Sequence, residues 1–313
     1  MPTPSITIGW IGAGRMGAQL ATRLLDAGYD VAVYNRTAAK AQHLADRGAT
    51  VVSRPVDLAN RDLVFSMVSS SKDLEEVMLG EHGLLTGEAS PRVIADASTV
   101  SAEASELIRN AANSRGADFL ATPVSGNPKV IAAGKLTVAV SGPREVFDAI
   151  EPVLNEFGRG VTYVGEGEVA RLVKIAHNLM LGVVTQCLAE ITVLVEKGGV
   201  SRADFLAFLN DSVMGSVFTQ YKSPAFVNLD FTPTFTMRLL QKDFDLGLEA
   251  AYLLKSPMPI ASATRQIVAQ AVGAGRGDEE DFATLLLDVA RGAGLTLQSE
   301  NVAVDDGLAP VGS

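Results

Sequence analysis

The stretch Ile6-Thr-Ile-Gly-Trp-Ile-Gly-Ala-Gly-Arg-Met-Gly17 decides the fold of this 313-residue chain. Its first six residues are mostly apolar and β-branched, as a strand buried on both faces should be, and helical periodicity follows from Met16 to Ala27. Three glycines stand between strand and helix in the spacing GxGxxG, which in this context is the fingerprint of a dinucleotide-binding turn. The alternative is a glycine turn that only serves packing.

Each glycine has a physical use in such a turn. Gly12 permits the sharp reversal, Gly14 lets the backbone approach a pyrophosphate, and Gly17 lets the helix pack closely on the strand. The free N–H groups at the start of the helix attract negative charge. We therefore expect a dinucleotide to contact the turn formed by Gly12, Ala13, Gly14, Arg15, Met16 and Gly17.

The residues after the second predicted strand, Asn35-Arg36-Thr37, indicate which dinucleotide binds. An NAD site carries an acidic residue here that takes the ribose hydroxyls, and an acid would repel a 2′-phosphate. Arg36 can pair with that phosphate and stack on adenine, Thr37 adds a hydroxyl donor, and Asn35 is neutral. NADP(H) is therefore the preferred cofactor, with NAD(H) as the second choice. The alternative is that Arg36 is a solvated charge and Thr37 a helix cap.

The first half of the chain alternates strand-like and helix-like stretches, which is typical of βαβ units and a mostly parallel sheet. The predicted strands are Ile6–Ile11, Asp30–Tyr34, Leu63–Val68, Val93–Ala97, Asp118–Ala121 and Leu136–Ser141. After Gly165-Glu-Gly167 no further strand is convincing. Helical spacing of apolar residues instead recurs over 168–197, 202–209, 236–254, 260–272 and 282–291.

These patterns predict an α/β fold, a Rossmann-type doubly wound parallel sheet followed by an all-helical C-terminal domain. Residues 1–165 form the NADP-binding domain, and residues 166–297 form a helical substrate and dimerisation domain that begins with a long interdomain helix. Residues 298–313 contain Asp305, Asp306, two glycines and a proline, and we expect them to be a disordered tail.

Composition narrows the class of protein. Lys and Arg number 26 against 36 Asp and Glu, a net charge of −10 that offers no footprint for nucleic acid or anionic lipid. Polar residues interrupt the most apolar segment, 169–195, so we expect no membrane span, and without an export signal we expect a cytoplasmic protein. The single cysteine, Cys187, excludes an intrachain disulfide and is expected to be packed. The histidines are too scattered to form a metal site: His43, His82 and His177.

Four motifs taken in order resemble the β-hydroxyacid dehydrogenase family. This family includes 3-hydroxyisobutyrate dehydrogenase and tartronate semialdehyde reductase and, more distantly, 6-phosphogluconate dehydrogenase and the imine reductases. The motifs span nearly the whole chain: Gly12-Ala-Gly-Arg-Met-Gly17, Pro123-Val-Ser-Gly126 with Gly134-Lys-Leu136, Gly167-x6-Lys174-x3-Asn178, and Lys242-Asp243.

The resemblance implies a role for several residues. Lys174 is the catalytic acid/base and Asn178 assists beside it, while Ser125 and Gly126 hold a substrate carboxylate. Five further cofactor contacts and a residue that closes the apolar side of the cleft are implied as well: Met67, Val68, Ser69, Thr99 and Lys242, and, for the cleft, Phe235. No metal takes part in such chemistry.

Physical reasoning agrees with the implied role of Lys174. Residues four apart on a helix share a face, so Lys174 and Asn178 can reach into one cleft between the domains. Burial and neighbouring positive charge, such as that of Lys242, would lower the pKa of the lysine from its reference value of about 10.4 toward the working pH. The alternatives are a surface lysine at 174, a core hydrogen bond at Asn178, a solvated Lys242-Asp243 pair, and His177 as a rival acid/base.

The sequence also departs from the family pattern. Ala121 stands where relatives commonly have Asp, and Asn127-Pro128-Lys129 follows Gly126 in place of a second glycine. Asn127 can therefore contact a more polar or doubly anionic substrate. The predicted function is hydride transfer between NADP(H) and a small β-hydroxyacid or its semialdehyde in a homodimer or homotetramer. The alternatives are an imine reductase, against which Lys174 argues, and a non-catalytic NADP(H)-binding sensor.

Overall fold

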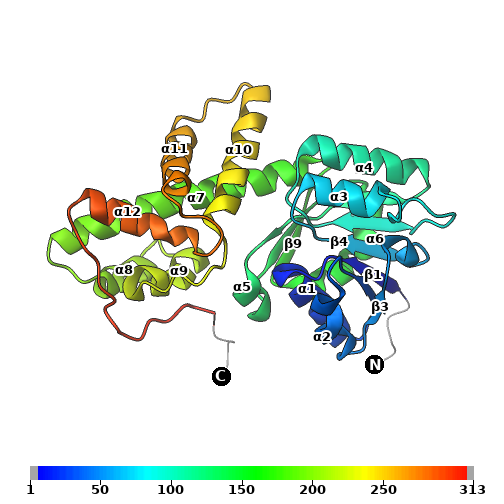
Figure 1. Cartoon of the computed structure of the whole chain (residues 1–313), viewed down its shortest axis with the longest axis horizontal. Helices are drawn as coiled ribbons and strands as arrows, with labels where there is room; N and C mark the ends of the chain where they lie inside the picture. Colours follow the sequence, from blue (N-terminus) through cyan, green and yellow to red (C-terminus); the bar gives the residue numbers. More distant parts are fainter. Residues whose placement is uncertain (1–5, 309–313) are drawn as a thin grey trace. The chain divides into compact units, whose positions relative to one another are not determined.

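The computed structural model describes residues 6–308 and divides into two compact units, residues 1–174 and 175–313 (Figure 1). The predicted boundary lay at 165, nine residues earlier. The difference arises because the first turn of the long helix that follows is bonded into the first unit, as the hydrogen bond from Ala170 N–H to Ser141 Oγ at 3.1 Å shows.

The first unit is built on one sheet in the order β3-β2-β1-β4-β5-β6-β8-β7, with β9 paired to β8. The pairings from β3 to β6 are parallel, β8 runs antiparallel to β6 and β7, and β9 runs parallel to β8. The strands are β1 (Thr7–Ile11), β2 (Asp30–Tyr34), β3 (Thr50–Val52), β4 (Leu63–Ser66), β5 (Val93–Asp96), β6 (Asp118–Ala121), β7 (Val124–Ser125), β8 (Thr137–Ser141) and β9 (Gly160–Gly165).

Helices cover both faces of this sheet, which confirms the doubly wound prediction. One face packs against Leu20 and Leu24 of one helix and Phe147 and Ile150 of another, and the other face packs against Leu74 and Ile108. The helices of the unit are α1 (Arg15–Asp26), α2 (Gln42–Ala45), α3 (Ser71–Leu79), α4 (Ala102–Ser114), α5 (Pro128–Ala132) and α6 (Arg144–Leu154).

Strand β1 lies where the order of the sheet reverses, with β2 on one side and β4 on the other. In open α/β sheets ligands bind beyond the carboxyl ends of the strands at this switch point. Trp10 on β1 is fully buried and packs against Phe65 and Phe157 at ring-centroid distances of 5.3 and 6.0 Å. Thr7 donates twice to the Asp62 carboxylate, which lowers the pKa of Asp62 and fastens the start of β1 to the strand beside it.

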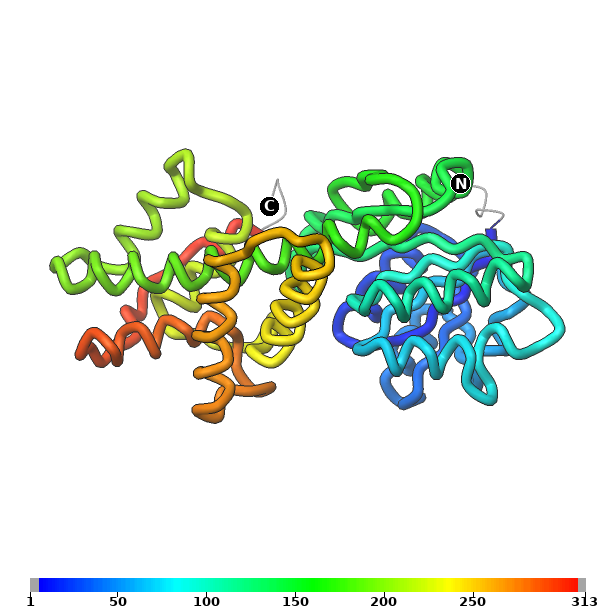
Figure 2. The backbone as a smooth tube through the Cα atoms, turned by 90° about the horizontal axis from the view of Figure 1, so that it is seen from above, coloured from blue at the N-terminus to red at the C-terminus, as the bar shows by residue number. Residues whose placement is uncertain are grey.

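The second unit is helical, as predicted. Helix α7 (Val169–Lys197) crosses from the first unit into it, and five more follow: α8 (Arg202–Asp211), α9 (Val217–Asn228), α10 (Met237–Leu253), α11 (Pro259–Gly273) and α12 (Leu285–Gly292). Helices α10 and α11 lie side by side as an antiparallel pair (Figures 1 and 2). From Ile175 to Leu308 the β-structure is limited to one isolated bridge, between Thr236 and Asp281.

The C-terminal segment differs from the expected disordered tail. Residues 298–308 have no regular secondary structure, yet the buried guanidinium of Arg202 donates to the Gln298 carbonyl at 2.5 Å. The Glu300 carboxylate in turn accepts from the backbone N–H groups of Arg202 and Ala203 at the start of α8. Hydrogen bonds to α8 and α9 therefore hold this segment, and its amino-acid composition alone does not predict them. Residues 309–313 lie outside the described part of the chain.

Two expectations concern α7 itself. Among residues 6–308 it is the one helix long and apolar enough to cross a membrane, and half of its most apolar window is buried inside the chain, as in the core helix of a globular protein. Cys187, expected to be packed, is exposed. That expectation is wrong because α7 packs on part of its circumference and leaves this position on the open side.

Candidate functional site at the carboxyl edge of the sheet and on helix α7

The glycine turn after β1 has the geometry that a dinucleotide needs. Gly12 has φ +102°, and a Cβ there would lie 2.2 Å from the Met67 carbonyl oxygen. A Cβ on Gly17 would lie 2.0 Å from the Gly12 carbonyl oxygen, so α1 packs directly on the turn. A Cβ on Gly14 would meet nothing within 4 Å, and Gly14 caps α1 without a side-chain hydrogen bond. The helix therefore presents its first N–H groups beside open backbone, which fits a pyrophosphate.

The segment after β2 has mixed roles. Asn35 Oδ1 accepts from the Ala13 N–H and its Nδ2 donates to the Thr37 carbonyl, both at 2.8 Å, so Asn35 braces the glycine turn. The Arg36 side chain is 83% exposed and donates to Asp73 Oδ1 at 2.9 Å. Thr37 precedes a short 3₁₀-helix but makes no side-chain capping bond to it. The Arg36 guanidinium therefore lies on the surface and pairs there with one acidic side chain.

The predicted cofactor contacts beyond β4 and β5 lie at the same edge of the sheet as the glycine turn. Met67 N–H donates to the Ile11 carbonyl at 2.8 Å, and Val68 N–H donates to Ser98 Oγ at 2.9 Å. Thr99 follows Ser98 directly, and Ser69 follows Val68. The carboxyl ends of β1, β4 and β5 thus bring these turns together.

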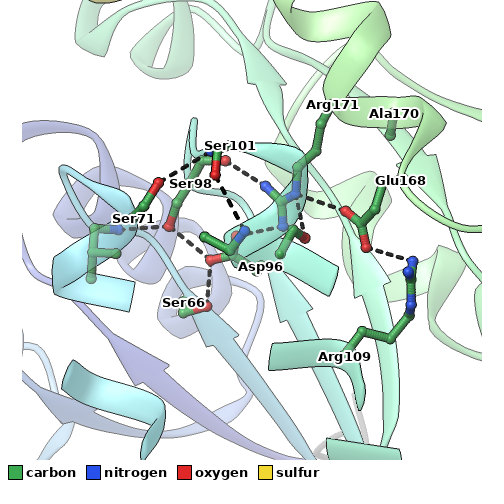
Figure 3. A network of polar contacts seen from close by, with 12 residues as sticks. Ser66, Ser71, Asp96, Ser98, Ser101, Arg109, Glu168, Ala170 and Arg171 are labelled. Atoms are coloured by element: carbon green, nitrogen blue, oxygen red, sulfur yellow. Dashed lines mark hydrogen bonds and ion pairs between the residues drawn. The ribbon is translucent and has the colours of Figure 1, made fainter. Parts of the chain in front are cut away.

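A buried ion pair at this edge escaped the sequence reasoning. Arg171, in the first turn of α7, is 3% exposed and donates to the Asp96 carboxylate at 2.7 Å (Figure 3). The pair spans 75 residues of chain, so no local motif announces it. The available signal was a charged residue within an apolar stretch at each position, since a buried charge needs a partner.

The residues expected to hold a substrate carboxylate form the turn after β7. Ser125 ends β7, and Gly126 has φ +146°, a conformation that favours glycine. Asn127 is buried, and its Oδ1 accepts from the Val130 N–H at 3.0 Å, so it caps α5. The departure from the family pattern therefore has a local structural use, because Asn127 and Pro128 begin a helix here.

The remaining predicted residues lie on α7 and α10. Asn178 is 4% exposed, and its Nδ2 donates to Asp243 Oδ2 at 2.5 Å. Lys242 Nζ lies 3.4 Å from Asp243 Oδ1, so within the second unit the two predicted residues meet at one buried carboxylate, to which the sequence analysis assigned no role of its own. His177 is exposed, and its Nδ1 lies 3.0 Å from Asn178 Oδ1.

Lys174 and Phe235 are the last two of the predicted site residues. Lys174 is half-buried on α7, one turn before Asn178. Phe235 is half-buried in the core of the second unit, where its ring meets Phe282 edge-on at 5.8 Å. Within residues 6–308 no three His, Cys, Asp or Glu side chains gather as a metal site would require.

Two family models together match most of the chain. The NAD binding domain of 6-phosphogluconate dehydrogenase matches residues 7–165, and the NAD-binding domain of NADP-dependent 3-hydroxyisobutyrate dehydrogenase matches residues 165–288. The chain is 33% identical over 278 residues to 2-(hydroxymethyl)glutarate dehydrogenase of Eubacterium barkeri, covering 88% of this chain and 92% of that protein. It is 30% identical to the chloroplastic glyoxylate/succinic semialdehyde reductase 2 of Arabidopsis thaliana, and the match covers 90% of this chain and 79% of that protein.

Solved structures and one further relative complete the comparison. A Mycobacterium tuberculosis 3-hydroxyisobutyrate dehydrogenase solved with L-serine superposes with TM-score 0.79 at 26% identity, covering 91% of this chain and 99% of that one. Psf3, solved with NADP⁺ and 2-OPP, superposes with TM-score 0.81 at 25% identity, and the match covers 90% of this chain and 100% of that one. An imine reductase from Myxococcus stipitatus superposes with TM-score 0.59 at 22% identity, and the match covers 89% of this chain and 98% of that one. This likeness shows a shared fold. The human cytokine-like nuclear factor N-PAC is 29% identical, and the chain spans 50% of its length.

The Eubacterium and Arabidopsis relatives, which share most of their length with this chain, are named as a dehydrogenase and a semialdehyde reductase, and both halves of the chain match NAD-binding regions of hydroxyacid dehydrogenases. The resemblance found in the four sequence motifs is thereby confirmed. The chain belongs to the β-hydroxyacid dehydrogenase family and is an NAD(P)-dependent oxidoreductase that acts on CH–OH groups.

Proposed function

We propose that this protein transfers a hydride between NADP(H) and a small β-hydroxyacid or the matching semialdehyde, with Lys174 as the acid/base. The observation that carries the proposal is the arrangement on α7. Lys174 and Asn178 lie one turn apart, and Asp243 holds the Asn178 side chain in a single orientation. A lysine and a fixed amide on one helical face are suited to binding and deprotonating a hydroxyl group.

When bound, the nicotinamide cofactor supplies the hydride acceptor or donor. The residues of the chain do the rest. In the oxidative direction the Lys174 amine takes the hydroxyl proton, and in the reductive direction its ammonium group returns that proton to the carbonyl oxygen. The turn at Ser125 and Gly126 offers a hydroxyl group and closely approachable backbone to the substrate carboxylate. Asn178 orients the hydroxyl group beside the lysine.

A screen of small hydroxyacids and semialdehydes with NADPH and NADH side by side tests the reaction class. We expect turnover of at least one carboxylate-bearing substrate and none of cyclic imines. NADPH-dependent reduction of cyclic imines without turnover of hydroxyacids would favour the imine reductase alternative. NADPH binding without any turnover would favour the sensor.

Cofactor preference follows from Arg36. Replacing it with alanine is expected to weaken NADPH binding by about 10- to 100-fold, the value of a charge-assisted phosphate contact, and to leave NADH binding nearly unchanged. Trp10 is the single tryptophan, and it precedes the glycine turn by two residues, so energy transfer from Trp10 to the reduced nicotinamide measures both affinities. Arg54→Ala is the control, because Arg54 is also an exposed arginine paired with an aspartate, Asp57. Equal losses for NADPH and NADH would contradict the assignment.

We further infer a cytoplasmic homodimer or homotetramer that binds neither nucleic acid nor membranes. The net charge of −10 supports the inference that the protein binds neither nucleic acid nor anionic membranes. Large exposed apolar side chains on the helices of the second unit support self-association. These side chains are Met180, Leu194, Phe208, Leu253 and Ile260, all more than 60% exposed. Light scattering at micromolar concentration is expected to give two or four times the chain mass of 32.8 kDa, and a mass of one chain would contradict the inference.

A further inference from the structure

The ion pair between Arg171 and Asp96 is the centre of a network that joins three segments of the first unit (Figure 3). Asp96, at the end of β5, is fully buried, and its Oδ1 accepts from Ser66 at 2.6 Å and from Ser98 at 2.7 Å. Its Oδ2 accepts from Arg171 at 2.7 Å. Ser66 ends β4, so one carboxylate fastens the ends of two neighbouring strands to the first turn of α7.

Arg171 uses the rest of its guanidinium on the same edge of the sheet. Its Nη1 donates to the Ser98 carbonyl at 2.7 Å, and its Nε donates to Ser105 Oγ and to the Glu168 carboxylate at 2.5 and 2.9 Å. Glu168 also accepts from Arg109 at 2.6 Å. All three nitrogens of the planar Arg171 guanidinium therefore donate hydrogen bonds, an arrangement that the single ammonium group of a lysine does not reproduce.

The segments held in this way are those expected to meet the cofactor. Ser98 accepts from the Val68 N–H and directly precedes Thr99, and both Val68 and Thr99 are predicted cofactor contacts. On α7, Lys174 is three residues beyond Arg171, and residues three apart share a helical face. Because Arg171 points at the carboxyl ends of β4 and β5, it sets the rotation of α7 about its axis and with it the direction in which Lys174 projects.

We propose that Arg171 is a positioning residue of the dehydrogenase, which through its bonds to Asp96 and Ser98 aligns the face of α7 carrying Lys174 with the turns that receive the nicotinamide. The inference rests on the proposed role of Lys174. Arg171 touches neither substrate nor cofactor in this account. Its loss misplaces the proton-exchanging group relative to the reacting carbon, and a misplacement of about 1 Å can cost on the order of 10²-fold in rate.

The test compares two ion pairs in which a buried arginine contacts a carboxylate. Arg171→Met with Asp96→Asn removes both charges at once, which avoids leaving an unpaired buried carboxylate. Arg202→Met with Glu196→Gln is the matched control in the second unit, since Arg202 is 1% exposed, pairs with Glu196 at 2.7 Å and also donates to backbone carbonyls. We expect both double variants to lower the thermal midpoint. Only the Arg171 variant is expected to lower kcat, by about 10- to 100-fold, and to raise the NADPH dissociation constant by a smaller factor, because Val68 and Thr99 are predicted cofactor contacts.

Arg171→Lys keeps the ion pair but loses the fork, so its kcat is expected to lie between that of the wild type and that of the double variant. Should the double variant not fold, Arg171→Lys and Ser98→Ala supply the same comparison, because Ser98→Ala retains both charges and removes the bond to Val68 N–H. A kcat loss no larger than in the Arg202 control, or a parallel loss of kcat and NADPH affinity, overturns the proposal.

Hydrogen exchange separates this proposal from the proposed function. The Val68 N–H is expected to exchange faster in Arg171→Lys than in the wild type, while amides within β4 keep their protection. If the wild type turns over no hydroxyacid, the proposed function fails, and the exchange measurement still decides whether Arg171 fixes the strand-end turns. Unchanged exchange at Val68 overturns the positioning role.

Discussion

Replacing Lys174 with methionine is expected to lower kcat by about 10²- to 10⁴-fold, the usual contribution of a positioned acid/base group. Methionine keeps the length and the apolar stem of lysine and is nearly as good a helix former, so α7 should remain intact. It carries no proton to exchange. The expected NADPH affinity, measured by energy transfer from Trp10, equals that of the wild type, because the glycine turn is untouched.

The control for this variant lies on the same helix. Lys197 is in the last turn of α7 and donates to the Ala293 carbonyl at 2.8 Å, so Lys197→Met removes an exposed lysine from the other end of the helix. Its kcat should match that of the wild type. A Lys174→Met enzyme that keeps more than about a tenth of its kcat would show that another group exchanges the proton. His177, one turn of helix away, would then be the next residue to replace.

The second large effect is expected at the glycine turn. Gly17→Ala places a methyl group 2.0 Å from the Gly12 carbonyl oxygen, which is backbone and has no rotamer to change, so α1 must move away from β1. We expect a loss of about 1–3 kcal/mol in the free energy of unfolding, as for other overpacked sites, and a fall of at least about tenfold in NADPH affinity. Urea unfolding and Trp10 energy transfer measure the two effects.

Gly14→Ala separates packing from binding at the same turn. The added methyl group meets no protein atom within 4 Å, so the free energy of unfolding should not change, whereas NADPH affinity should fall because the methyl group occupies the approach of the pyrophosphate. Gly160→Ala on β9, where a Cβ also meets nothing within 4 Å, should change neither quantity. Wild-type NADPH affinity in Gly14→Ala would place the pyrophosphate elsewhere.

Much of the fold was predictable because its long elements carry strong periodic signals. The strands that form the centre of the parallel sheet are apolar runs, and GxGxxG locates the switch point between them. The missed strands are β3 and β7, which are two to three residues long, and β9, whose residues are only partly buried. Helix α9 was missed because Pro224 lies inside it and its apolar residues do not form one stripe.

The sequence motifs propose residues for the site, but they do not predict which of these side chains contact one another. The motifs identified Asn178 and Lys242, while the carboxylate that holds Asn178 lies 65 residues away on α10. The acidic partner of Arg171 is equally remote in sequence. Pairs of this kind depend on how elements pack, and a single sequence contains no periodicity that relates them. Asn127 shows the converse, since an unusual residue at a predicted substrate position caps a short helix.

The C-terminal segment supplies hydrogen-bond acceptors that residues at the start of α8 need. The Glu300 carboxylate accepts from the first N–H groups of α8, and the Gln298 carbonyl accepts from the buried guanidinium of Arg202, 96 residues earlier in the chain. A chain that ends after α12 would keep the helices α1 to α12. It would lack the Gln298 carbonyl that accepts from Arg202 and the Glu300 carboxylate that accepts from the first N–H groups of α8. Products truncated at that point would differ from the 313-residue chain in their resistance to unfolding and proteolysis rather than in the arrangement of their helices.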